Sequence, residues 1–221
     1  MGALRKGVQD EMVEFSTTFH APARPRIVVQ LARLDLDSGE RGTPEILSPA
    51  DRGREEFLAG RRALRAHLAA LLGCAPADVP LRVDGSGRLV VAGGDLHVSV
   101  SRSEGWLAVA TSRDCPIGVD VEAVRPLPHL GTVVDELLPR RGRAAVLAAA
   151  PADRVAVFLR WWTRIEAAVK ACGGSLDAAP ACLAAAPQVT CDIAPGLALA
   201  AAAAVPDARP SVEWRWPGTS R

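Results

Sequence analysis

The 221-residue sequence predicts an α+β fold of two similar subdomains, residues 1–114 and 115–221. The first observation is that both halves combine helical segments with short apolar runs, which are separated by glycine-containing turns and are typical of antiparallel strands. The second is that these segments follow a similar order in both halves, with a seam near residues 113–116. We therefore expect a pseudo-twofold arrangement in which each subdomain packs helices on a small antiparallel sheet.

The amino-terminal half is predicted to begin with a strand at residues 26–31. A helix is expected at residues 49–73, because apolar side chains recur there at helical spacing and Gly73 provides a stop. Short apolar runs separated by glycine turns then predict four antiparallel strands. These strands are expected at residues 81–83, 89–91, 97–101 and 107–110.

The carboxy-terminal half opens with a β-branched run at residues 117–122, which predicts a strand. After a loop that contains prolines, helical segments are expected at about residues 140–150 and 152–172. Two short apolar runs joined by a glycine turn close this half. They predict strands near residues 188–193 and 197–205.

Charge and composition narrow the class of protein. The 26 basic residues nearly balance the 25 acidic ones. A net charge of +1 argues against a nucleic-acid binder that relies on bulk electrostatics. Only Lys6 and Lys170 are lysines, and the other 24 basic residues are arginines. Because this bias replaces lysine almost everywhere, a lysine at position 170 is informative.

Cysteine usage and hydropathy predict a cytoplasmic protein. The five cysteines are scattered and form no C-x-x-C pair, so neither a disulfide framework nor a zinc site is expected. No apolar run follows Arg5 and Lys6, so we expect no signal peptide. Prolines and an aspartate interrupt the most apolar stretch, residues 181–205, which argues against a transmembrane helix. The chain also lacks the generic P-loop, Rossmann, zinc-protease and serine-hydrolase signatures.

Two carboxylates stand out in the strand predicted at residues 117–122. Asp120 and Glu122 are two residues apart, so they share one face of the strand, while the neighbouring valines take the other. Adjacent carboxylates repel each other unless a cation lies between them. Mg²⁺ bound together with substrate phosphates would suit this pair. The alternative is a solvated acidic face on an edge strand.

A second pair lies in the helix predicted at residues 152–172. Glu166 and Lys170 are four residues apart and share a helix face with Trp162. One interpretation is an ordinary Glu–Lys helix pair worth about 0.3–0.5 kcal/mol. The scarcity of lysine favours another, in which a compact ammonium is needed at a position that a guanidinium does not fit.

Arginines and hydroxyl groups form a third set of candidates. Arg61 and Arg65 lie one turn apart on the first predicted helix, where they would suit phosphate contacts. The alternative is a solvated face in an arginine-rich protein. The strand at residues 97–103 ends in Ser101, Arg102 and another serine. By itself this strand end carries little information, because serines are frequent at strand ends.

Taken together and in this order, these segments resemble the Sfp-type 4′-phosphopantetheinyl transferase family. The family pattern has G-R-x-x-L-R on a helix, a strand like H-F-N-x-S-H-S, then G-[IV]-D-[IV]-E and W-x-x-K-E-A-x-x-K-x-x-G. The resemblance extends over about residues 54–176 and implies the family's two-subdomain fold, with CoA and a metal ion in the cleft. The corresponding segments are residues 60–65, 97–103, 118–122 and 161–173.

The resemblance also implies an activity. Such enzymes move the 4′-phosphopantetheine arm of coenzyme A onto a serine of an acyl or peptidyl carrier protein and release 3′,5′-ADP. The expected cofactor is Mg²⁺, and the expected partners are coenzyme A and an apo carrier protein of polyketide, nonribosomal peptide or fatty acid biosynthesis. The protein is expected to be a cytoplasmic monomer that binds neither nucleic acid nor membrane.

Roles at the catalytic centre follow from the same resemblance. It implies that Asp120, Glu122 and Glu166 hold the metal ion and the pyrophosphate. Asp120, Glu166 and Lys170 are then the catalytic residues. Glu166 would help to remove the proton from the incoming serine hydroxyl, and Lys170 would bind the phosphates and stabilise charge on the leaving ADP oxygen.

The resemblance assigns the remaining candidates to coenzyme A. Arg61 and Arg65 are expected to hold the end that carries the 3′-phosphate. Ser101 and Arg102 are expected near the phosphates, together with Lys170.

Three positions depart from the family pattern. Arg102 replaces the second histidine of S-H-S, and Ile165 replaces a lysine. Arginines stand at positions 140 and 141, before Gly142, where many members carry an acidic residue. These departures keep a second interpretation open, namely a non-catalytic member of the fold that binds coenzyme A or a carrier protein.

Overall fold

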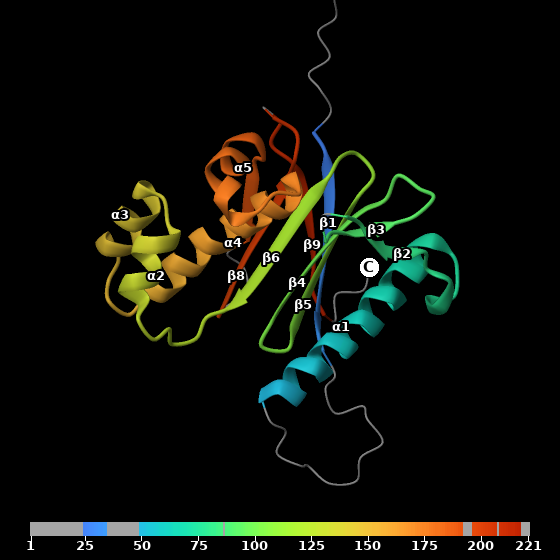
Figure 1. Ribbon diagram of the computed structural model, residues 1–221, viewed down its shortest axis with the longest axis horizontal. Helices are drawn as coiled ribbons and strands as arrows, with labels where there is room; N and C mark the ends of the chain where they lie inside the picture. Colours follow the sequence, from blue (N-terminus) through green and yellow to red (C-terminus); the bar gives the residue numbers. More distant parts are fainter. Residues whose placement is uncertain (1–23, 35–48, 86, 192–195, 207, 218–221) are drawn as a thin grey trace, which may run out of the picture.

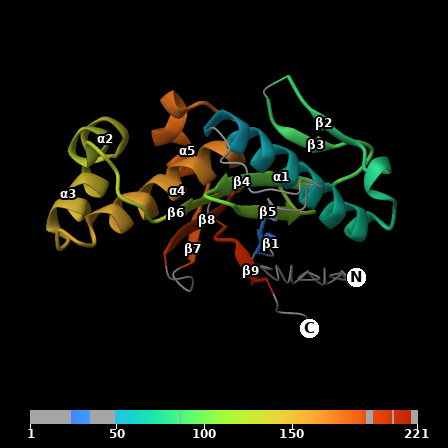
Figure 2. The same ribbon diagram turned by 90° about the horizontal axis from the view of Figure 1, so that it is seen from below.

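The computed structural model of the protein describes residues 24–34, 49–85, 87–191, 196–206 and 208–217. Within these segments, two sheets pack against each other, with a two-stranded hairpin and five α-helices around them (Figures 1 and 2). The predicted α+β class is confirmed. None of the described helices is long and apolar enough to cross a membrane.

The first sheet has the strand order β4-β5-β1-β9. Strands β4, β5 and β1 are antiparallel, whereas β9 runs parallel to β1. The expectation of a purely antiparallel sheet is therefore wrong at this edge, because the short, charged run that forms β9 carries no clear strand pattern. The strands span His97–Ser103 (β4), Trp106–Ser112 (β5), Arg26–Arg33 (β1) and Ser211–Arg215 (β9).

The second sheet is antiparallel and has the order β6-β8-β7. Its strands span Ile117–Ala123 (β6), Leu197–Ala203 (β8) and Gln188–Cys191 (β7), close to the predicted ranges. The remaining strands, Leu81–Val83 (β2) and Leu89–Val91 (β3), form a separate hairpin. Because β9 returns from the end of the chain to the first sheet, the boundary between residues 114 and 115 and the pseudo-twofold relation both stay predictions.

Helices cover the outer faces of the two sheets (Figure 2). Helix α1 packs Leu64 and Leu68 against β4 and β5, and helix α4 lies across β6 and β8. Helices α2 and α5 were not predicted, because each is only about two turns long and lies next to prolines. The helices span Pro49–Leu72 (α1), Leu130–Leu137 (α2), Arg140–Ala148 (α3), Arg154–Cys172 (α4) and Ala179–Ala185 (α5), with 3₁₀ turns at Pro76–Asp78 and Leu176–Ala178.

The core between the two sheets fixes the orientation of β6. Val119 and Val121 of β6 are fully buried there against Ile27, Val29 and Leu31 of β1. Successive side chains of a strand point to opposite faces. The opposite face of β6, which carries the two carboxylates, is therefore turned away from this core.

Helix α4 contacts the backbone of β6 directly at Gly118. A Cβ at this position would lie 1.9 Å from the carbonyl oxygen of Ala167 and 2.6 Å from the amide nitrogen of Ala171. These backbone atoms of α4 cannot move independently, so only glycine allows this approach. The contact brings the last turns of α4, with Lys170, next to β6.

We predict that Gly118→Ala destabilises the protein by about 1–3 kcal/mol, the usual cost of an extra methyl group in a packed core. The matched control is Gly131→Ala in α2, where a Cβ would meet nothing within 4 Å. Alanine is favoured over glycine in helices by up to about 1 kcal/mol, so the control should be neutral or stabilising. Urea unfolding measures both variants, and equal stability of Gly118→Ala and the parent protein would contradict the close approach.

Candidate active site

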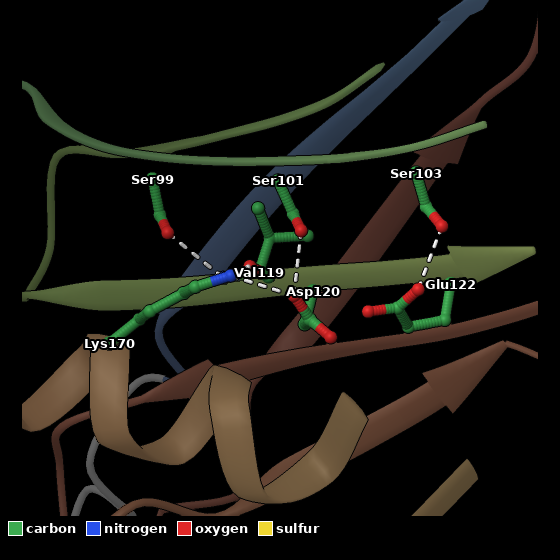
Figure 3. A network of polar contacts seen from close by, with 7 residues as sticks. All are labelled: Ser99, Ser101, Ser103, Val119, Asp120, Glu122 and Lys170. Carbon is green, nitrogen blue, oxygen red and sulfur yellow. Dashed lines mark hydrogen bonds and ion pairs between the residues drawn. The ribbon is translucent and has the colours of Figure 1, made fainter. Parts of the chain in front are cut away.

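Asp120 is the most deeply buried charged side chain at the site, with 3% of its surface exposed. Its Oδ1 accepts hydrogen bonds from Ser101 Oγ at 2.6 Å and from Lys170 Nζ at 2.7 Å (Figure 3). Its Oδ2 is buried and has no hydrogen-bond partner. A buried carboxylate oxygen without a donor is costly, and it is the kind of atom that a bound cation would satisfy.

Lys170 links α4 to β6. Besides the ion pair with Asp120, its Nζ donates to the backbone carbonyl of Val119 at 3.2 Å. The Lys170 side chain is 30% exposed. Glu166 lies one turn earlier on the same helix and is half-buried. The predicted Glu166–Lys170 face of the helix is therefore turned toward the carboxylates of β6.

Three serines of β4 form a row beside β6, which we name the serine row: Ser99, Ser101 and Ser103 (Figure 3). Because they alternate along the strand, all three side chains point to one side of it. Ser103 Oγ donates to Glu122 Oε2 at 2.7 Å and accepts the amide N–H of Ala123 at 3.1 Å. The sequence indicated only Ser101 from this row.

Burial makes the three acidic side chains of the site reluctant to ionise. It raises the pKa of Asp120 above its ordinary value, although Lys170 and the Ser101 hydroxyl favour the charged form. Burial likewise raises the pKa of Glu122 and of Glu166, and the negative charge of Asp120 adds to both increases. A cation would relieve this strain, because it stabilises the charged form of all three.

The donor atoms fit a metal ion that shares its ligands with a substrate. Within the described residues, no preassembled group of three or more histidine, cysteine, aspartate or glutamate side chains could hold a metal ion. Mg²⁺ is usually bound by only one or two carboxylates together with substrate phosphates and water. The unpartnered Oδ2 of Asp120 and the nearby Glu122 match that requirement. The three-carboxylate set that includes Glu166 stays a prediction.

Two of the predicted phosphate-binding arginines meet at Phe57 of α1. The guanidinium carbons of Arg61 and Arg102 lie 5.2 Å and 5.1 Å from the centroid of its ring. Arg102 passes so close to Gly60 that a Cβ there would lie 2.8 Å from its Cδ. Because neighbouring residues of β4 point to opposite faces, Arg102 faces α1 while Ser101 faces β6. The predicted binding residues therefore lie on two sides of β4.

Arg65 has a structural task. Its Nη1 donates to the carbonyl oxygens of Pro76 and Val79 at 3.0 and 3.1 Å. These bonds hold the turn that follows α1. A contact of Arg65 with coenzyme A stays a prediction.

A cavity of about 430 Å³ opens beside the ion pair. Lys170, Glu166 and Ser99 line it, together with Arg88, which sequence reasoning missed. Arg88 follows the turn of the β2–β3 hairpin. Its Nη1 would lie 2.8 Å from a Cβ at Gly173. An arginine next to a hairpin turn is a weak signal, because its approach to α4 depends on how the hairpin packs.

Some of the residues that depart from the family pattern take part in packing. Ile165 is 2% exposed and belongs to the core under α4. The guanidinium carbon of Arg164 lies 4.6 Å from the centroid of a Trp161 ring, so it stacks there. Arg140 is the first residue of α3 and is exposed.

Comparisons with known proteins each match part of the chain. Residues 116–198 match the family described as the 4′-phosphopantetheinyl transferase superfamily. Over 84 residues, 38% of this chain and 44% of the relative, the sequence is 33% identical to the 4′-phosphopantetheinyl transferase AcpT of Salmonella typhimurium. Over 127 residues, 56% of this chain and 54% of the relative, it is 28% identical to the 4′-phosphopantetheinyl transferase HetI of Nostoc sp.. The chain thus spans about half the length of these curated relatives.

The matched segment includes β6 and α4, the two elements that carry the carboxylates and Lys170. Assignment to the Sfp-type subfamily stays a prediction. Residues 116–198, which hold two of the four motifs, thus match the 4′-phosphopantetheinyl transferase superfamily, in agreement with the predicted resemblance.

Proposed function

We propose that the protein transfers the 4′-phosphopantetheine group of coenzyme A to a serine of an acyl or peptidyl carrier protein and releases 3′,5′-ADP. The observation that carries this proposal is the buried Asp120–Lys170 pair at the edge of a cavity that Glu166 and Arg88 also line. The relatives named 4′-phosphopantetheinyl transferases support phosphopantetheine transfer in general. A cytoplasmic location and a monomeric state are part of the same proposal.

The reaction forms a bond between the serine oxygen of the carrier protein and the phosphorus next to the pantetheine arm. The phosphorus–oxygen bond to the ADP portion breaks, and its electron pair leaves with that oxygen. Glu166 takes the serine proton, directly or through water, and its burial favours this by raising its pKa. Lys170 neutralises charge on the phosphates. Phosphoryl transfer needs such positioning and charge neutralisation more than covalent help from the protein.

Asp120, Glu122 and Glu166 are the residues that would hold Mg²⁺. When bound, Mg²⁺ neutralises phosphate charge and polarises the phosphoryl group toward attack. On the chain itself, Lys170 balances the charge of Asp120. Arg61 and Arg102 extend the cationic surface on the α1 side of β4. We propose that they bind the 3′-phosphate end of coenzyme A, together with Arg65 of α1. Ser101 would lie near the pyrophosphate.

The direct test incubates the full chain with coenzyme A, Mg²⁺ and an apo acyl or peptidyl carrier protein. Mass spectrometry of the carrier should show the addition of one phosphopantetheine group, and the small-molecule product should be 3′,5′-ADP. A protein that is stabilised by coenzyme A but leaves the carrier mass unchanged would instead be the non-catalytic binding protein.

We predict that Glu166→Gln lowers the transfer rate by about 10²–10⁴-fold, the usual contribution of a general base. The amide keeps the size of the side chain but cannot accept the serine proton. The carrier-mass assay at saturating coenzyme A measures the effect. Glu136→Gln is the control, because Glu136 is an exposed carboxylate on α2. A Glu166→Gln variant that transfers at the parent rate would exclude Glu166 as the base.

The same Glu166→Gln variant should be more stable than the parent protein at neutral pH without divalent cations. Burial raises the pKa of Glu166 above its ordinary value of 4.5, so the folded state binds more protons than the unfolded state just above that pH. The folded parent therefore loses stability as the pH rises through the raised pKa, whereas the amide does not titrate. Thermal unfolding from pH 4 to pH 8 should show the two melting temperatures diverging as the pH rises, and parallel curves would contradict the burial effect.

We predict that Lys170→Arg lowers the transfer rate by at least about tenfold, equal to about 1.4 kcal/mol of activation free energy. The planar guanidinium is too large for the space in which Nζ reaches both Asp120 and Val119. Arg143→Lys on α3 is a control for a basic exchange away from the site. Unchanged turnover of Lys170→Arg would show that only the positive charge matters.

A further inference from the structure

Ser103 lies where the carboxylate of Glu122 and the backbone of β6 meet. Its Oγ accepts the amide N–H of Ala123 at 3.1 Å and lies 2.7 Å from Glu122 Oε2 (Figure 3). A serine hydroxyl has one hydrogen to donate. Because the carboxylate can only accept, that hydrogen points to Oε2. The hydrogen bond from the Ala123 amide holds Ser103 Oγ beside β6, so the hydroxyl is an oriented donor to Glu122.

The surrounding contacts keep Ser103 in this position. The β4–β5 turn that follows it is tied to the end of β6 by an ion pair between Glu104 Oε1 and Arg125 Nε at 3.2 Å. The carbonyl of Glu104 also accepts a hydrogen bond from Arg33 of β1 at 3.1 Å. The turn next to Ser103 is therefore tied both to β1 and to the segment that follows β6.

The two carboxylates of β6 are held in the same way. Ser101 donates to one oxygen of Asp120, and Ser103 donates to one oxygen of Glu122. Asp120 Oδ2 is buried without a hydrogen-bond partner, and Oε1 is the oxygen of Glu122 that Ser103 does not contact. In Figure 3 these two oxygens point toward the space between the two side chains. Two carboxylate oxygens that face a shared space suit a divalent cation.

We propose that Ser103 is a positioning residue that holds Glu122 with its Oε1 directed at a divalent cation shared with Asp120. This inference rests on the proposed function, because it concerns the same metal site. Groups that orient a metal-binding side chain typically change metal affinity by about 10- to 100-fold when they are removed. Ser103 touches neither substrate nor cation, and it acts only through Glu122.

The test compares Ser103→Thr with Ser103→Val. Threonine and valine have nearly the same shape and both favour strands, but only threonine keeps the hydroxyl. Isothermal titration of the full chain with Mn²⁺, without coenzyme A, gives the affinity of each variant. We expect Ser103→Thr to bind within about threefold of the parent protein and Ser103→Val to bind about 10- to 100-fold more weakly.

Ser99→Ala separates positioning from a loss of structure. Ser99 Oγ accepts the amide N–H of Val119 at 3.0 Å, the same kind of bond that Ser103 makes with Ala123. It touches no carboxylate of β6. Ser99→Ala should therefore lower the thermal stability but leave the Mn²⁺ affinity unchanged. Equal Mn²⁺ affinities of Ser103→Thr and Ser103→Val, a similar weakening in Ser99→Ala, or no Mn²⁺ binding by the parent protein would each overturn the proposal.

The outcome separates this inference from the proposed function. A chain that binds Mn²⁺ in a Ser103-dependent way but leaves an apo carrier protein unmodified would support the positioning role and refute the transferase activity. A chain that modifies the carrier, with Mn²⁺ affinity independent of the residue at position 103, would do the reverse.

Discussion

The site depends on the serine row, because β6 has a neighbouring strand in its sheet on one edge only. On that edge β6 pairs with β8, and on the other edge Ser99 and Ser103 accept amide N–H groups of β6 at 3.0 and 3.1 Å. An unpaired buried amide would cost about 1–3 kcal/mol. Ser103 also donates to Glu122, and Ser101, between Ser99 and Ser103 on the same face of β4, donates to Asp120. The serine row therefore both satisfies this edge of β6 and holds the two carboxylates.

The second constraint is the charge of Asp120. A buried carboxylate is costly without a cation beside it, and α4 supplies that cation with Lys170. Gly118 brings the helix to this place, because α4 rests directly on the backbone of β6 there. Lys170 then reaches both Asp120 and Val119. Gly118 contributes no chemical group of its own, yet its packing determines whether Lys170 and the carboxylates of β6 come together.

The alternation of the carboxylates and valines in β6 and the shared face of Glu166 and Lys170 were predictable, because both follow from the repeat of one element. The contacts of the serine row and of Arg88 were not predictable. Their partners lie on other elements, and neither serines in a strand nor an arginine after a turn indicates a direction. The parallel pairing of β9 was missed for the same reason, since a short polar run has no pattern of its own.

Lys170 shows how a single position can resist the composition of the chain. Most basic positions here carry arginine, and exposed ones such as Arg140 and Arg141 place no demand on the shape of the head group. Lys170 Nζ instead donates to two acceptors on adjacent residues of one strand. An ammonium gathers its donors around one atom, whereas a guanidinium needs a flat opening. Gly118 fixes the distance between α4 and β6. Space for a guanidinium would therefore require α4 to move away from β6, which would expose Asp120 to solvent.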